Sequence, residues 1–104
     1  MNLLRDLPGT GGGEMIERLA GGGTVRIERI VSRGDKSPDG FWYDQDEAEF
    51  VVVLSGAARL EFADGEAVDL DPGDWIDIAP HRRHRVAWTA PGEATVWLAV
   101  FYRA

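Results

Sequence analysis

Five side chains between residues 43 and 84 carry a phenol, an amide, a carboxyl group and two imidazoles: Tyr43, Gln45, Glu49, His81 and His84. A buried carboxylate without a partner is costly, so Glu49 needs a metal ion, a charged His84 or a hydrogen bond from Tyr43. Without a metal, Glu49 and His84 could act as an acid–base pair. The chemistry open to this set is therefore metal binding through oxygen and nitrogen atoms, or proton transfer.

These groups need rigid elements to hold them, and the sequence favours strands over helices. No stretch sustains helical periodicity, whereas short runs rich in β-branched and aromatic residues recur between turn residues, as in a sandwich or barrel. Strands are predicted at residues 14–20, 24–32, 41–44, 49–55, 57–62, 66–70, 75–79, 83–89 and 94–102, with a hairpin turn at 63–65. Residues 1–13, which include the run Gly11-Gly12-Gly13, are expected to form a flexible lead-in, and residues 14–104 a single barrel domain.

Side-chain parity along two predicted strands supports a site inside this barrel. If Glu49 points inward, Val51 does so too, and the same rule groups His84 with Val86 and Trp88. Each set places a polar group at one end of an apolar row. A barrel with a packed floor and a polar mouth needs this arrangement.

Composition narrows the class of protein further. The chain of 104 residues is short enough to be one domain, and its net charge of −7 disfavours a nucleic-acid partner. It has no cysteine, so neither a disulfide framework nor a thiolate metal site is expected. No apolar run is long enough to span a bilayer, and the N-terminus lacks the apolar region of a secretory signal, so we expect a cytoplasmic protein without a membrane partner.

Two predicted strands are apolar on both faces, at residues 50–54 and 96–102. A strand with one wet face should alternate between apolar and polar side chains. A partner must therefore cover the second face, either the N-terminal segment or another subunit. We expect a homodimer, because obligate interfaces resemble a core cut in half.

The segment from Gly65 to Val86 is the most specific motif of the chain. It reads as a strand, a turn, a second strand and a histidine that enters a third strand, and its marker residues are Gly65, Pro72, Gly73, Asp74, Ile78, Pro80 and His84. This pattern resembles the second motif of the small single-domain, RmlC-like cupins. The resemblance implies a cupin double-stranded β-helix, or jelly roll, of about nine to eleven strands.

The first cupin motif is only half present. Glu49 and Gly56 have the separation of its glutamate and glycine, but Tyr43 and Gln45 stand where the pair of histidines is expected. The sequence WYDQ at residues 42–45 is similar to a cupin subgroup that lacks this pair. By this resemblance Gln45, Glu49 and His84 would bind a divalent metal such as Zn, Mn, Fe or Ni, and Tyr43 and Glu49 would be catalytic.

His81 and the aromatic residues leave alternatives open. His81 could reach the mouth of the barrel as an extra ligand or proton carrier, or it could be an exposed turn residue. Phe41, Trp42, Tyr43, Trp88 and Trp97 could line a pocket for a sugar or an aromatic substrate, or they could only pack the core and an interface.

The leading functional hypothesis is a small cupin that binds a metal and a small molecule at the barrel mouth. Such a protein could be a metal-dependent dioxygenase, isomerase or decarboxylase. The alternatives are a metal-free module that binds or senses a metabolite or sugar, and a structural dimer whose site is degenerate. The fold alone does not choose among them.

Overall fold

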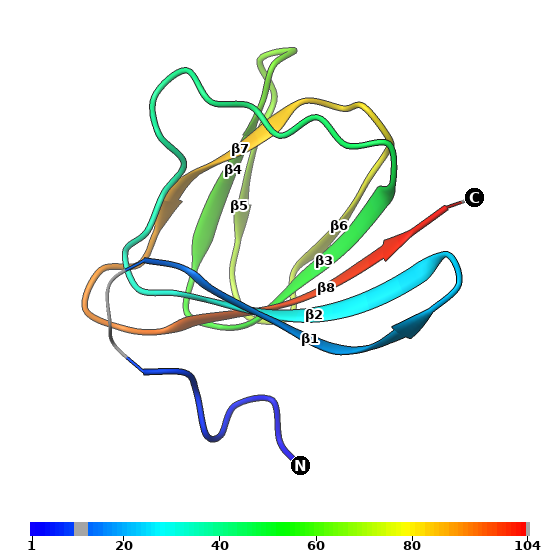
Figure 1. Ribbon diagram of the computed structural model, residues 1–104. Helices are drawn as coiled ribbons and strands as arrows, with labels where there is room; N and C mark the ends of the chain where they lie inside the picture. Colours follow the sequence, from blue (N-terminus) through cyan, green and yellow to red (C-terminus); the bar gives the residue numbers. More distant parts are fainter. Residues whose placement is uncertain (10–12, 104) are drawn as a thin grey trace.

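The computed structural model describes residues 1–9 and 13–103, and within them the regular elements are eight β-strands. Their bounds are β1 Met15–Gly22, β2 Val25–Ser32, β3 Ala48–Ser55, β4 Ala58–Phe62, β5 Ala67–Leu70, β6 Trp75–Ile78, β7 His84–Thr89 and β8 Thr95–Tyr102. Five strands form one sheet in the order β1-β2-β8-β3-β6, and three form a second sheet in the order β5-β4-β7. All the pairings are antiparallel, and the two sheets face each other as the walls of a barrel (Figure 1). The predicted all-β class is confirmed.

The predicted strand over residues 41–44 is the main difference from the sequence expectation. That segment makes only an isolated bridge, in which the backbone N–H of Tyr43 donates to the His84 carbonyl oxygen at 2.7 Å. The bridge still joins the loop before β3 to the start of β7. It therefore fixes Tyr43 beside His84 without a full strand.

The core lies between the two sheets. Its buried side chains come from both walls: Val51, Val53, Ala58, Leu60, Phe62, Leu70, Ile78, Trp97, Ala99 and Phe101. Removing apolar surface from water stabilises the fold by about 25 cal/mol per Å². This packing holds β3 and β7 against each other, and those two strands carry Glu49 and His84.

One parity expectation is wrong, because Trp88 does not point into the barrel. Its side chain is 46% exposed, whereas Thr89 is buried. The cause is an irregularity in the pairing of β4 with β7, where Arg59 pairs with Trp88 but the next residue, Leu60, pairs with Val86. The extra residue in β7 is a β-bulge, which reverses the side-chain alternation beyond Val86.

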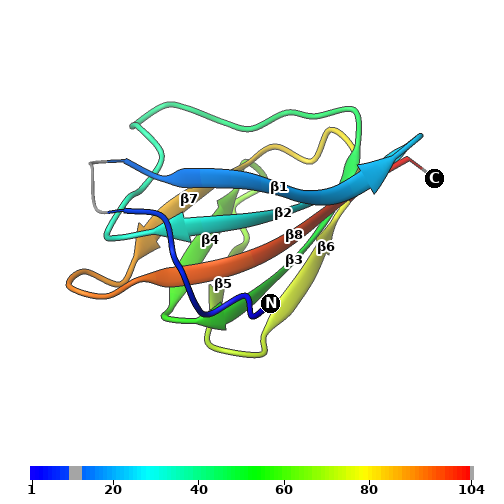
Figure 2. The ribbon, with the colours of Figure 1, turned by 60° about the horizontal axis from the view of Figure 1, so that its bottom comes forward.

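The N-terminal segment, residues 1–9, crosses the outer face of the larger sheet (Figure 2). The buried guanidinium of Arg29 on β2 holds it there by donating to the carbonyl oxygens of Leu3, Arg5 and Asp6 at 3.1–3.4 Å. Glu17 accepts further hydrogen bonds from the same guanidinium. Residues 10–12 of the expected flexible lead-in lie outside the described residues. In the part of the chain that the structure describes, no helix is long and apolar enough to cross a membrane.

Candidate functional site

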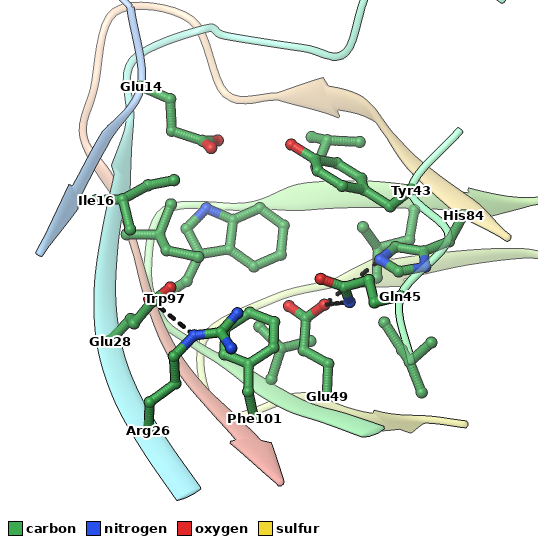
Figure 3. Close-up of a pocket in the computed structure, with 15 residues that line it drawn as sticks. Glu14, Ile16, Arg26, Glu28, Tyr43, Gln45, Glu49, His84, Trp97 and Phe101 are labelled. Carbon is green, nitrogen blue, oxygen red and sulfur yellow. Dashed lines mark hydrogen bonds and ion pairs between the residues drawn. The ribbon is translucent and has the colours of Figure 1, made fainter. Parts of the chain in front are cut away.

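A cavity of about 280 Å³ opens at one end of the barrel. Its polar lining comes from the residue before β1, from β2, from the loop before β3 and from β3 and β7: Glu14, Arg26, Glu28, Tyr43, Gln45, Glu49 and His84. Apolar side chains, including Trp97 and Phe101 of β8, form its floor (Figure 3). The arrangement is the polar mouth and packed floor that the sequence pattern predicts.

Glu49 stands near the start of β3 and projects into the cavity. It pairs with Ile78 of β6, whose buried side chain belongs to the core, so both residues face the interior. The Gln45 amide nitrogen donates to Oε1 of Glu49 at 3.0 Å, and Nε2 of His84 lies 3.5 Å from the same oxygen. Glu49 is thus held by two neighbours that the sequence placed in the same candidate site.

His84 is almost fully buried, and its two ring nitrogens have different surroundings. Nδ1 lies 2.9 Å from the Arg82 carbonyl oxygen, which can only accept, so Nδ1 carries a proton and Nε2 faces Glu49. Burial alone would lower the pKa of His84, but the interactions with Glu49 and the Arg82 carbonyl raise it above its ordinary value. These interactions therefore favour the protonated form of the imidazole.

Tyr43 covers one side of His84. The two rings are stacked with their centroids 5.4 Å apart, and Phe41 meets the Tyr43 ring edge-on at 4.8 Å. Burial raises the pKa of the Tyr43 phenol, and the negative charges of Glu14 and Glu49 raise it further. Tyr43 therefore keeps its proton and can donate a hydrogen bond into the cavity.

His81 does not join this group. Its side chain is 66% exposed, and Nδ1 lies 2.7 Å from Oδ1 of Asp44. The backbone of His81 has a φ of 61°, and its N–H donates to the carbonyl oxygen of Gln45. This turn directs the ring away from the cavity, so the placement differs from the expectation of a ligand at the mouth and matches that of an exposed turn residue.

The sequence reasoning missed two acidic residues of the cavity, Glu14 and Glu28, which line it together with Arg26 and with Trp97, one of the aromatic residues expected to line a pocket. Ser32 donates to Oε2 of Glu14 at 3.0 Å and accepts from Nε1 of Trp97 at 3.1 Å. Burial is the largest cause that raises the pKa of Glu14; the Ser32 hydrogen bond opposes it, and the charges of Asp35 and Glu49 add to the rise. The signal was the period-two alternation of Arg26, Glu28 and Ile30 along β2, which places all three side chains on the inner face.

The donor set does not fit a tightly held divalent metal. Among residues 1–9 and 13–103, no three His, Cys, Asp or Glu side chains gather so that they could hold an ion. The amide of Gln45 directs its nitrogen, rather than its oxygen, at Glu49. Tyr43 keeps its proton, so its phenol is a poor ligand. Only Glu49 and His84 remain as strong donors, whereas a metal site normally has at least three protein ligands.

Comparisons with known proteins agree with this fold. The family model described as "Cupin domain" matches residues 27–101. The crystal structure of a "putative mannose-6-phosphate isomerase" from Ralstonia eutropha JMP134 is 46% identical, with a TM-score of 0.94 over 100% of this chain and 97% of that one. An RmlC-like cupin from Shewanella frigidimarina NCIMB 400 is 20% identical, with a TM-score of 0.73 over 92% of this chain and 81% of that one. No curated protein matches the chain.

Proposed function

The chain belongs to the cupin domain family, and from that premise we propose that it binds a small organic molecule in the barrel cavity and transfers protons on it with Glu49 and His84. The observation that supports this proposal is the approach of Nε2 of His84 to Oε1 of Glu49, 3.5 Å apart on the wall of a cavity of about 280 Å³. An imidazole and a carboxylate at this distance can share a proton. Both also face the space that a ligand would fill.

The two groups divide the roles of acid and base. Glu49 is the acceptor, because it already receives a hydrogen bond from Gln45 and lies beside the imidazole. His84 is the donor, because Nδ1 is held by the Arg82 carbonyl oxygen and Nε2, beside Glu49 on the cavity wall, can pass its proton to a ligand oxygen. Such a pair can remove a proton from a carbon next to a carbonyl group and protonate the carbonyl oxygen. The product is an enediol, and when its other hydroxyl group then loses a proton and the former carbonyl carbon gains one, an aldose has become a ketose without any net oxidation.

The relative from Ralstonia eutropha, which is 46% identical, is named as an isomerase, and an isomerase reaction of this chain would agree with that name. In this chain, however, Gln45 and Tyr43 occupy the positions where the first cupin motif has its histidine pair, and the donor set does not fit a resident metal. We therefore assign the proton transfers to side chains. The metal on Gln45, Glu49 and His84 that the family resemblance implies is not part of this proposal, and the Discussion gives the measurement that would establish it.

A binding or sensing module without catalysis is the second candidate. The half-buried Tyr43 beside the cavity, with Trp97 on its floor, favours it, because aromatic rings line many small-molecule sites. The third hypothesis, a structural dimer with a filled cavity, required Trp88 and Tyr43 to occupy the barrel. Trp88 lies on the outer surface instead, so that hypothesis has lost its main support.

A ligand screen tests the proposal. A library of neutral, anionic and cationic metabolites is scored by the thermal shift of the wild type, and each hit is repeated with Glu49→Gln and His84→Gln. Glu93→Gln is the matched control, because Glu93 is exposed and lies outside the cavity. We expect hits that both cavity variants weaken and the control does not. For hits with a carbonyl group, we also expect exchange of the adjacent proton with deuterium from the solvent. A screen whose hits ignore both cavity variants would refute the proposal.

A further inference from the structure

The charges around the cavity indicate what kind of molecule it accepts. We infer that its ligand is a small organic cation, an amine held between Glu14 and Glu49, and not a phosphorylated or otherwise anionic compound. This inference rests on the proposed function, since it names the ligand class of the same cavity.

Carboxyl groups outnumber basic groups in the lining. Glu14, Glu28 and Glu49 face the cavity, and in the described part of the chain the basic side chains that do so are Arg26 and His84. A cleft lined mainly by one sign of charge, with low-dielectric walls, concentrates ions of the opposite sign. The apolar floor supplies those walls, so the cavity favours a positive ligand.

Arg26 is already engaged and is not available to an anion. Its Nε lies 3.2 Å from Oε2 of Glu28, and its Nη1 makes an ion pair with Glu47. The guanidinium also lies over the ring of Phe101, 4.0 Å from the centroid. A phosphate would have to approach this guanidinium beside both carboxylates, whereas anion sites usually offer arginine or backbone donors that are not already paired with acids.

The carboxyl groups of Glu14 and Glu49, by contrast, can still accept hydrogen bonds from a ligand. Within the described residues, Ser32 reaches only Oε2 of Glu14, and Gln45 and His84 reach only Oε1 of Glu49. The second oxygen of each carboxyl group is left to accept from a ligand. An ammonium group has three donors and no acceptor, so it matches the acceptors that these two carboxyl groups offer.

The walls between these acids suit a cation as well. The rings of Tyr43 and Trp97 border the cavity, and Figure 3 shows the Glu14 and Tyr43 side chains directed toward each other across it. Aromatic faces attract ammonium groups, most strongly where water is excluded. In addition, a carboxyl group whose pKa burial has raised, as in Glu14, gains most from a cation placed beside it.

The charges of this cavity do not suit the sugar phosphate in the name of the Ralstonia eutropha relative. A mannose 6-phosphate molecule carries about two negative charges near neutral pH, as other phosphate monoesters do. It would meet three carboxyl groups and an occupied arginine in this cavity. The ring of such a sugar is compatible with the proposed chemistry, but its phosphate group is not.

Two series of probes test the inference, each with a cationic, a neutral and an anionic member. The sugar series is mannosamine, mannose and mannose 6-phosphate. The second series is cyclohexylamine, cyclohexanol and cyclohexanecarboxylate. Dissociation constants are measured at pH 7.5 by NMR titration of the labelled full chain. We expect each amine to bind at least tenfold more tightly than its neutral partner, and the anions to bind most weakly. Glu14→Gln should reduce the preference for the amine to about threefold or less, and Glu93→Gln should preserve it.

Several outcomes overturn the inference. Tighter binding of an anion than of its neutral partner would do so, as would equal binding of all three charge states or no saturable binding of any probe. The proposed function is judged separately by the metabolite screen. Anionic hits there that depend on Glu49 and His84 would keep the proposed function and remove the amine. A screen whose hits ignore the cavity variants would remove both.

Discussion

Nε2 of His84 on β7 lies 3.5 Å from Oε1 of Glu49 on β3, so an ion pair joins the smaller sheet to the larger one at the cavity wall. The partners are separated by more than thirty residues in the sequence. The same interaction thus has two consequences. It sets the protonation of the proposed catalytic pair, and it contributes to the stability of the barrel.

The first prediction concerns pH. The folded-state pKa of His84 is raised, so its stabilising contribution is fully present below the unfolded-state pKa and is lost as pH rises through the folded-state value. The free energy of unfolding from urea titration should therefore contain a component that falls as pH rises above about 6.5. Glu49→Gln should remove that component and cost about 1 to 3 kcal/mol at pH 6.

The matched control for this pH effect is the other histidine. His81 makes an exposed pair with Asp44, and exposed ion pairs contribute about 1 kcal/mol or less. His81→Asn should leave the pH-dependent component in place, because asparagine tolerates the positive φ of that position. If His81→Asn abolished the component and Glu49→Gln did not, the pair in the cavity would not be its source.

The second prediction concerns the stability that the protein loses by burying the carboxyl group of Glu14. Burial raises the folded-state pKa of Glu14, so the native state loses stability as pH rises through that value and the side chain becomes charged. Glu14→Gln should therefore stabilise the protein by about 1 kcal/mol at pH 8 and have little effect at pH 4. Thermal unfolding at both pH values measures this. A variant that is less stable at pH 8 would contradict the assignment.

The sequence predicted the strands well because turn residues mark their ends. Observed strand ends lie within about two residues of the predicted ones, apart from the segment 41–44, which makes only a bridge. Local patterns cannot show where a partner strand gains a residue. The bulge in β7 therefore reversed the expected direction of Trp88, and only the pairing with Arg59 and Leu60 reveals it.

The candidate site was predicted in part. Tyr43, Gln45, Glu49 and His84 do line one cavity, and the family motif placed them there by their spacing. Glu14 was missed because it belongs to no motif and reaches the cavity only through the hairpin of β1 with β2. The direction of His81 was left open because it depends on the turn conformation, which residue spacing does not determine.

The third prediction concerns metal. Because the described donors do not gather three His, Cys, Asp or Glu side chains, purified untagged protein should carry well below one equivalent of Mn, Fe, Ni or Zn. Elemental analysis of wild type beside His84→Ala measures this. Near-stoichiometric metal that disappears in the variant would instead establish the metal site on Gln45, Glu49 and His84.

The fourth prediction concerns the expected homodimer. The outer face of the larger sheet carries Phe50 and Trp75, whose rings are 5.3 Å apart, and Trp75 is 61% exposed. The N-terminal segment is held over another part of that face by Arg29. We expect a dimeric mass in light scattering at micromolar concentration, and Trp75→Lys should shift it to the monomer. Trp88→Lys, on the smaller sheet, is the control that should stay dimeric. A monomeric wild type would refute the homodimer.

The last prediction concerns Gly56, the glycine of the first cupin motif, of which this chain has only half. Gly56 has a φ of 83°, and a Cβ atom there would lie 2.6 Å from the Cα of Thr95, a buried residue at the start of β8. Gly40 has a similar φ of 78° but open space around it. Alanine at either position meets the strain of the left-handed region, about 1 to 2 kcal/mol. Gly56→Ala must also push backbone away from β8, so its total cost should exceed about 3 kcal/mol.

Urea unfolding of both variants measures the difference. Equal costs would mean that Gly56 serves only its backbone conformation, and a larger cost confirms that it lets the turn after β3 approach β8.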